Sequence, residues 1–223
     1  MSSYVIGDVH GCSRTLEELV TNKLCLKEPD HLYLVGDYID RGPDSKGVLD
    51  FIIDIGKQYQ VVPLMGNHEW MLLEAALSNS SPEIWLYNGG EATLESFGAA
   101  AANKIPAEYI AFIKSLKLYH ELDKHLLVHA GFNLDVEDMY EDRNAMLWAR
   151  CVTYPDDAEE LQGRIVVHGH TPITREELVE SVNNHSNGIN LDTGCVFTGT
   201  EGMGYLAALD LDTRELIFQE NIE

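Results

Sequence analysis

Residues 7–11 read Gly7-Asp8-Val9-His10-Gly11 and directly follow the apolar run at residues 4–6. Two later segments repeat this arrangement: Gly36-Asp37-Tyr38-Ile39-Asp40-Arg41-Gly42 follows the run at 31–35, and Gly66-Asn67-His68-Glu69 follows the run at 61–65. Short runs of Val, Ile, Leu and Tyr favour strands. Polar loops at the carboxyl ends of strands form the usual ligand site of an open α/β sheet. The three segments therefore predict one polar site built from three loops.

Helical periodicity fills the spaces between these predicted strands. Apolar residues recur at helical spacing from Ser13 to Leu24 and again in the segment opened by Pro43 and Asp44. Helical crossovers imply parallel strands, and right-handed crossovers bring the three loops to one edge of the sheet. A helical middle, expected at residues 68–77, 82–86, 91–97 and 106–116, would cap the site.

The second half of the chain returns to strand patterns. We expect strands at 125–128, 164–167, 189–192, 204–211 and 216–219, the last two joined by a hairpin turn at Asp212-Thr213. The sequence has no linker, repeat or low-complexity tract, and 45% of it is hydrophobic. These features predict an α/β fold in which residues 1–223 form a single domain.

The charge balance excludes several classes of partner. Thirty-seven acidic and fifteen basic residues give a net charge of −22, which opposes binding to nucleic acid or to an anionic membrane. A phosphate ligand would have to be attracted locally, by metal ions and a few arginines. Neither a signal peptide nor an apolar run of about 18 residues is apparent, and the cysteines form no CxxC pair. We therefore expect a cytoplasmic protein.

The polar residue types indicate a metal site. Asp8 and His10 are two residues apart in an extended loop, so both could face one ion, and Asp37 could bridge two ions. Neutral ligands would come from Asn67, His129 and His170. This mixture of carboxylate, imidazole and amide oxygen suits an Mn, Fe or Zn ion of a reactive centre better than it suits a Cys-rich structural zinc site. Two cations about 3.5–4 Å apart would serve in-line phosphoryl displacement.

The three motifs, spaced about thirty residues apart, resemble the signature of the phosphoprotein-phosphatase branch of the calcineurin-like metallophosphoesterases. The similarity is closest to small bacterial and phage serine/threonine protein phosphatases, and it extends to residues 85–90, 147–150, 169–172 and 191–194. The resemblance implies a sandwich of central β-sheets flanked by helices, with the site at the carboxyl ends of the strands. It also implies two divalent cations, Mn²⁺ first, with Fe or Zn as alternatives.

Carried over residue by residue, the resemblance divides the site into two metal positions and a phosphate-handling group. It places the first metal at Asp8, His10 and Asp37, and the second at Asp37, Asn67, His129 and His170. His68 would be the general acid and Asp40 its orienting partner, while Arg41 and Arg150 would grip the phosphate. A hydroxide bridging the metals would attack directly, without a phosphoenzyme.

Each of these assignments has a simpler structural alternative. Asp8, Asp37 and Asn67 could cap helices, Asp40 could pair with Arg41, and Arg150 could be a surface residue. His168 is not assigned to metal, because Pro172 stands where the two-histidine form of the motif has its second ligand, so His168 is expected to pack near the site. Glu69 belongs to the third motif but receives no chemical role.

The leading hypothesis is a metal-dependent serine/threonine protein phosphatase acting on phosphorylated proteins or peptides. The enzymatic alternative is a symmetrical diadenosine tetraphosphatase or another small-molecule phosphoesterase. Symmetrical diadenosine tetraphosphatases usually lack the Asp that stands at position 40 here, and they end the third motif in Asp. A catalytically inactive binding module is a further alternative, opposed by the presence of every expected ligand. We expect specificity to lie in the helical middle and in a loop from Glu176 to Gly188. The oligomeric state stays open.

Overall fold

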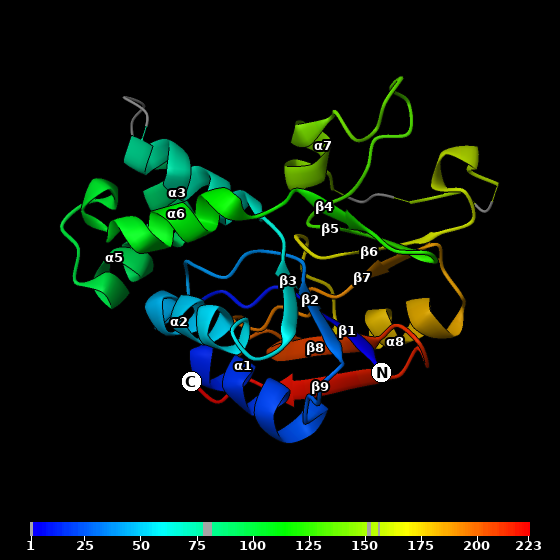
Figure 1. The fold of residues 1–223 in the computed structure, drawn as a ribbon, viewed down its shortest axis with the longest axis horizontal. Helices are drawn as coiled ribbons and strands as arrows, with labels where there is room; N and C mark the ends of the chain where they lie inside the picture. Colours follow the sequence, from blue (N-terminus) through cyan, green and yellow to red (C-terminus); the bar gives the residue numbers. More distant parts are fainter. Residues whose placement is uncertain (1, 78–81, 151–152, 156) are drawn as a thin grey trace.

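Two β-sheets form the centre of the computed structural model, which describes residues 2–77, 82–150, 153–155 and 157–223. The first sheet contains β1 (Ser3–Ile6), β2 (His31–Leu34), β3 (Gln60–Pro63), β8 (Tyr205–Asp210) and β9 (Leu216–Glu220). The second contains β4 (Tyr119–Glu121), β5 (His125–Val128), β6 (Ile165–His168) and β7 (Gly188–Asn190). Figure 1 shows the two sheets one above the other.

The strand order explains how distant segments meet. The first sheet runs β3-β2-β1-β8-β9, with β1, β2 and β3 parallel, as their crossover helices predict. Strands β8 and β9 form the expected antiparallel hairpin, whose turn is held by Asp210 Oδ1 accepting from the backbone N–H groups of Asp212 and Thr213. The second sheet runs β4-β5-β6-β7, with β5, β6 and β7 parallel. Its three-residue edge strand β4 was not predicted.

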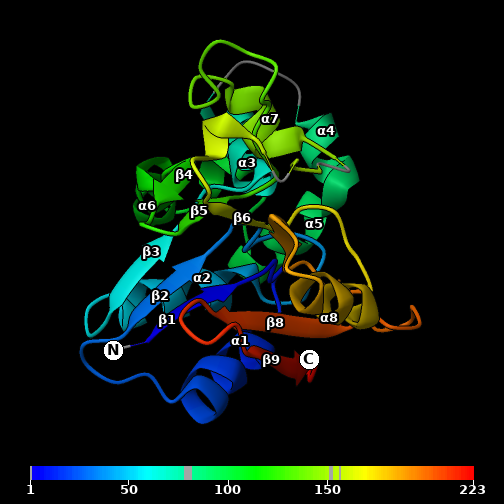
Figure 2. The ribbon, with the colours of Figure 1, turned by 90° about the vertical axis from the view of Figure 1, so that its right-hand side faces the viewer.

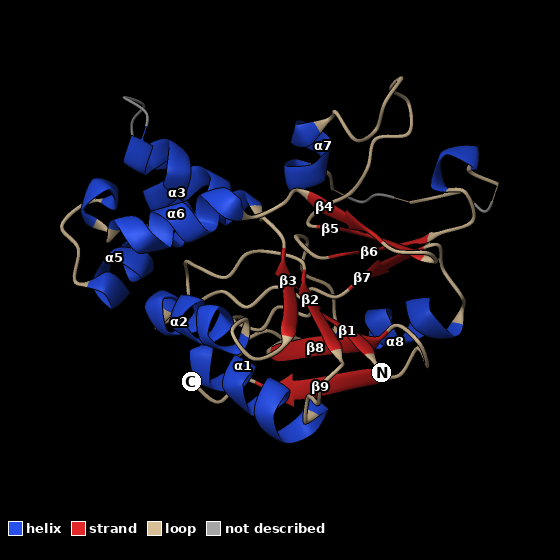
Figure 3. Ribbon diagram, in the orientation of Figure 1, coloured by secondary structure: helices blue, strands red, loops and turns tan. Residues whose placement is uncertain are grey.

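Helices lie around the two sheets (Figure 3). In chain order they are α1 (Ser13–Glu18), η1 (Leu19–Leu24), α2 (Ser45–Ile55), α3 (Asn67–Leu77), α4 (Glu83–Trp85), η2 (Leu86–Gly90), α5 (Glu91–Phe97), η3 (Ala102–Lys104), α6 (Ala107–Ser115), α7 (Arg143–Trp148), η4 (Glu159–Leu161) and α8 (Arg175–Asn183). The predicted helical middle is confirmed as α3 to α6, which group together at one end of the molecule in Figure 1.

The prediction of a loop from Glu176 to Gly188 is wrong, because most of this segment belongs to helix α8. Thr174 accepts a hydrogen bond from Glu177 N, and Glu177 Oε2 accepts from Thr174 N, which is a complete capping box. Leu178 and Val182 then bury one face of α8 against β7 and the inter-sheet core. This segment therefore supports the sandwich.

Alternation along the strands divides the core into layers. In β1, Val5 faces the second sheet and packs with Leu127 and Val167, while Ile6 faces the other way, toward the α1 and α2 side chains. The outer face of the second sheet is covered by Phe132, Met139, Met146, Tyr154 and Leu161, and Figure 2 shows α7 above β4, β5 and β6. The parallel strands of both sheets thus lie back to back across one buried layer.

No helix among the described residues is both long and apolar enough to cross a membrane.

Candidate active site

Loops from both sheets converge where their parallel strands end. The loop after β1 joins the loop after β2 through His10 N, which donates to Asp37 O at 2.8 Å. It also joins the loop after β6 through Asp8 Oδ2, which accepts from His170 N at 3.0 Å. The predicted meeting of the three motifs at one edge is therefore observed, and the second sheet adds His129 and His170 to the same place.

Asp37, Asn67, His129 and His170 bring their ligand atoms together. His129 Nε2 lies 2.9 Å from Asn67 Oδ1, 3.2 Å from His170 Nδ1 and 3.4 Å from Asp37 Oδ1. Donors bound to one cation at about 2.1 Å stand about 3.0–3.4 Å apart at octahedral or tetrahedral angles. These four residues therefore fit one divalent cation.

Asp37 also presents its second oxygen to the other predicted metal position. His10 Nε2 lies 3.6 Å from Asp37 Oδ2, so the two oxygens of this carboxylate face the two groups of ligands. Asp8 lies beside them with Oδ1 buried and without a hydrogen-bond partner among the described residues. Burial and then the neighbouring Asp192 and Asp37 carboxylates raise the pKa of Asp8. An oxygen in this position is one that a cation would satisfy.

The charges around Asp37 favour the protonation states that metal ligands require. Burial opposes the charge of Asp37, but His129 and then the other surrounding imidazoles hold its pKa well below the usual range. Burial lowers the pKa of His10 and of His129, and it lowers the pKa of His170 to about 3. Neutral imidazoles around an ionised carboxylate form a donor set suited to a cation.

The helix-cap alternative holds in part for Asp37. Its Oδ1 accepts from His68 N, in the first turn of α3, at 3.1 Å while also facing His129. Asp8 does not cap α1, since the cap position there is Cys12 and the first-turn N–H of Thr15 donates to Glu223 Oε1 at 2.9 Å. Asp37 therefore caps α3 and also faces the ligand cluster, so helix capping does not explain the whole arrangement.

His68 and Asp40 form a buried pair beside Asp37. His68 Nδ1 lies 2.7 Å from Asp40 Oδ2, and His68 Nε2 lies 3.9 Å from Asp37 Oδ2. Burial disfavours the charged imidazole, but Asp37 and the hydrogen bond to Asp40 together outweigh it and raise the pKa of His68. This arrangement fixes which nitrogen faces the site and favours the protonated form.

Asp40 is held by residues from the helical middle. Trp85 Nε1 donates to Asp40 Oδ2 at 2.9 Å, and Thr93 Oγ1 donates to Asp40 Oδ1 at 2.6 Å. Gly90 makes room for this contact, because a Cβ there would lie 2.5 Å from the Trp85 ring. Trp85 lies in one of the segments of resemblance without having been given a role, and Thr93 was not singled out at all.

The two predicted phosphate-binding arginines are placed differently. Arg41 NH1 donates to His10 Nε2 at 2.7 Å, and Arg41 NH2 donates to His68 Nε2 at 2.9 Å. A cation on His10 Nε2, or a proton on His68 Nε2, therefore requires the guanidinium to move away from these nitrogens. Within the described residues it forms no ion pair with Asp40. Arg150 is exposed and lies close enough to His170 for its charge to help lower the pKa of that imidazole, after burial and His129.

Backbone strain is concentrated at these residues. Positive φ angles occur at His10 (46°), Asp37 (52°), Asp40 (72°), Arg41 (69°) and His170 (75°). Side chains other than Gly rarely adopt this region without a local constraint. The surrounding structure therefore holds five of the ten predicted site residues in a conformation that the isolated loops would not prefer.

Glu69, which received no chemical role from the sequence, joins two of the loops. It is fully buried, and its two oxygens accept from four backbone N–H groups: those of Asp37 at 2.9 Å, Tyr38 at 2.8 Å, Ile39 at 3.3 Å and Gly66 at 3.0 Å. Glu69 of the third motif thus holds the backbone of the second motif at residues 37–39 through hydrogen bonds. The signal in the sequence was an acid directly after Asn67 and His68 that had no ligand role of its own.

His168 ends β6 and does not join the ligand cluster. Its Nδ1 lies 3.1 Å from Gly169 O, and burial lowers its pKa to about 4. It lies beside the site, as expected.

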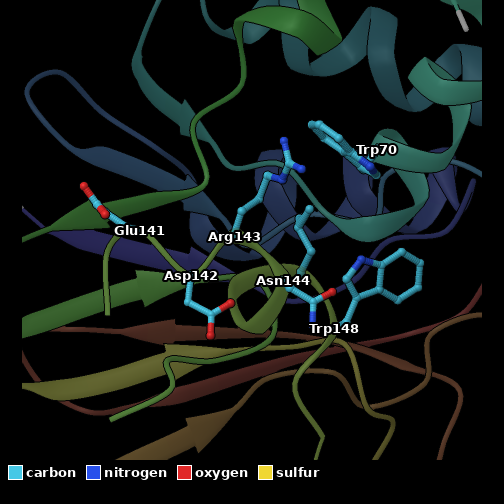
Figure 4. Close-up of a pocket in the computed structure, with 7 residues that line it drawn as sticks. Trp70, Glu141, Asp142, Arg143, Asn144 and Trp148 are labelled. Carbon is cyan, nitrogen blue, oxygen red and sulfur yellow. The ribbon is translucent and has the colours of Figure 1, made fainter. Parts of the chain in front are cut away.

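A hollow of about 490 Å³ lies next to the cluster and is lined by residues of α3 and of the segment 141–148 (Figure 4). The ring of Trp148, on its wall, is edge-on to His170 with 6.3 Å between centroids. On another wall the Arg143 guanidinium stacks over Trp70, 4.1 Å from the ring centroid. The hollow offers two indole rings and a guanidinium beside the metal ligands.

Comparison with known proteins agrees with this geometry. The family model described as calcineurin-like phosphoesterase matches residues 1–199. Serine/threonine-protein phosphatase 1 of Salmonella typhimurium is 31% identical over 202 residues, covering 88% of each chain. The asymmetrical bis(5'-nucleosyl)-tetraphosphatase PrpE of Halalkalibacterium halodurans is 30% identical over 221 residues, covering 87% of this chain and 86% of its own.

Among solved structures, a putative diadenosine tetraphosphatase superposes with a TM-score of 0.68 at 21% identity, covering all of this chain and 94% of its own. This likeness supports the fold. Since the matched family model spans most of the sequence, the chain belongs to the calcineurin-like phosphoesterase family.

Proposed function

We propose that this chain is a serine/threonine protein phosphatase that works with two divalent cations, Mn²⁺ first among them. The residues that would hold the cations are Asp8, His10, Asp37, Asn67, His129 and His170. When bound, such ions supply positive charge for the phosphate oxygens and a water of lowered pKa as the nucleophile. Arg41, between His10 and His68, would hold phosphate oxygens through its forked guanidinium.

The observation that carries the choice of substrate is the buried His68–Asp40 pair. A serine or threonine alkoxide is a strongly basic leaving group, so it needs a proton as its bond to phosphorus breaks. A nucleoside phosphate leaves as a weakly basic anion and needs much less assistance. His68 has a raised pKa, a fixed Nδ1 partner and an Nε2 turned toward Asp37. Once Arg41 leaves Nε2 to bind the phosphate, this nitrogen would carry and deliver that proton.

The test compares two leaving groups in the variant His68→Asn, with Mn²⁺ present. On a phosphoserine peptide we expect kcat to fall by about 10²–10⁴-fold. On p-nitrophenyl phosphate we expect a much smaller fall, because the phenolate leaves without a proton. Bound Mn²⁺, measured in parallel, should not change.

Equal losses on both substrates, or a collapse of metal content in a folded variant, would remove His68 from the acid role. No hydrolysis by the wild type with any divalent metal would overturn the enzymatic proposal itself.

One observation favours a second candidate, hydrolysis of a dinucleoside polyphosphate. Arg143 has no carboxylate partner among the described residues of a chain with a net charge of −22, and its guanidinium is stacked on Trp70. A free guanidinium beside two indoles suits a further phosphate with a planar base, which a phosphoserine lacks. Relatives named as tetraphosphatases make this comparison worthwhile.

The variant Arg143→Gln separates the two candidates. If the hollow binds a nucleotide, kcat/KM for diadenosine tetraphosphate should fall at least tenfold while hydrolysis of p-nitrophenyl phosphate stays unchanged. If the wild type cleaves the phosphoserine peptide far faster than the dinucleotide, and the variant alters neither, this second candidate is wrong.

A further inference from the structure

Asp192 carries a carboxylate oxygen without a partner at the edge of the candidate metal site. It follows β7 and is 1% exposed. Its Oδ1 accepts from Gly194 N at 3.0 Å, but Oδ2 is buried and has no hydrogen-bond partner among the described residues. A buried carboxylate oxygen left in this state is costly unless a cation or a proton satisfies it.

The segment that carries Asp192 packs directly against the first metal loop. A Cβ built on Gly7 would lie 2.2 Å from Leu191 O, so the backbones at Gly7-Asp8 and Leu191-Asp192 run side by side. Asp8 contributes a second buried oxygen without a partner, its Oδ1. Two neighbouring buried carboxylates, each with an unsatisfied oxygen, repel one another and together favour a positive charge between or beside them.

The groups facing Asp192 do not already provide that charge as an ion pair. The charged and titratable side chains near it include Asp8, Asp37, Arg41 and His68, and the guanidinium of Arg41 is hydrogen-bonded to His10 and His68. Asp192 forms no salt bridge within the part of the chain described. Its free oxygen is thus available to the same site that Asp8 and Asp37 border.

We propose that Asp192 is a further anionic residue of the metal centre, whose Oδ2 strengthens binding of the cation held by Asp8, His10 and Asp37. This inference rests on the two-cation centre of the proposed function. It makes the two positions unequal: three carboxylates would serve the first, whereas the second has only Asp37 with neutral donors. The first position should accordingly bind a hard divalent cation more tightly than the second.

The variant Asp192→Asn tests this with little change of shape. The amide oxygen can still accept from Gly194 N, and the substitution removes the negative charge that acts on buried Asp8. We therefore expect metal-free protein that is as stable as the wild type or more so, measured by urea unfolding. Calorimetric titration of the metal-free variant with Mn²⁺ should show the tighter Kd weakened at least tenfold and the weaker Kd little changed.

Asp210→Asn is the matched control, since Asp210 is also a buried turn-holding carboxylate but lies at the opposite end of the first sheet. It should leave both Kd values unchanged. An unchanged tighter Kd in Asp192→Asn, or a less stable metal-free variant with the Kd preserved, overturns the inference and leaves the proposed function standing. A wild type that binds no Mn²⁺ overturns both.

Discussion

Glu69 offers the most exacting test of how the site is held together. Each carboxylate oxygen accepts from two backbone N–H groups: Oε2 from Asp37 and Gly66, and Oε1 from Tyr38 and Ile39. In Glu69→Gln one oxygen becomes an NH₂ group, which cannot accept. Two buried N–H donors then lose their acceptor and face another donor.

The size of the effect follows from that count. A buried donor left without its acceptor costs about 1–3 kcal/mol, so two of them cost about 2–6 kcal/mol of unfolding free energy. This is a large share of the total of about 5–15 kcal/mol for a domain of ordinary stability. Since Asp37 N is one of the four donors, Mn²⁺ binding should weaken as well.

Urea unfolding at pH 6 measures the loss. Burial, with Asp37 beside it, raises the pKa of Glu69 to about 8, so at pH 6 the side chain is neutral in both proteins and the difference in stability reports the lost acceptor; above pH 8 the variant would also escape the cost of the buried charge. Glu95→Gln, the same change at an exposed position of α5, should shift stability by less than about 0.5 kcal/mol. If Glu69→Gln loses under 1 kcal/mol and binds Mn²⁺ normally, the Glu69 hydrogen bonds are not what orders these loops.

Three further outcomes follow from the same contacts. Asp40→Asn removes a hydrogen bond that raises the pKa of His68, so the pH at which kcat is lost on the alkaline side should move lower; a pH profile with a phosphoserine peptide measures this. Trp85→Phe deletes the indole N–H donated to Asp40 and should cost about 1–2 kcal/mol of stability, measured by urea unfolding, with a lower kcat. When free Mn²⁺ is kept at 100 times its Kd, removing the metal should lower the free energy of unfolding by about 2.7 kcal/mol. The Tm should fall by about 5–11 °C, measured by calorimetry.

Local patterns in the sequence predicted most of the fold. Strand, polar loop and helix follow one another within about thirty residues, so the parallel β1, β2 and β3 could be inferred from spacing alone. Strand β4 is too short for a periodic pattern and exists because it pairs with β5. Helix α8 escaped notice although the capping box at Thr174 and Glu177 marks its start.

The candidate site was also predictable only in part. Its proposed ligands lie in short motifs, whereas the residues that hold Asp40 in place lie far from it along the chain. Thr93 meets Asp40 across 53 residues, and Trp85 meets it across 45. The unpartnered oxygen of Asp192 is a property of packing alone, which no residue pattern reports. Similarity does not fix the substrate either, because relatives of nearly equal identity, 31% and 30%, carry different names.

The left-handed backbone angles of the site have a consequence for how the molecule fails. Strained residues cost roughly 1–3 kcal/mol each, and five of them lie in loops whose neighbours are rigid strands. Because this backbone strain is confined to the loops, we expect the loops to unfold locally before the sheets do. Under mild heating or in dilute urea, the catalytic loops should exchange their amide hydrogens while the sandwich is still intact, so the protein would lose its chemistry before it loses its shape.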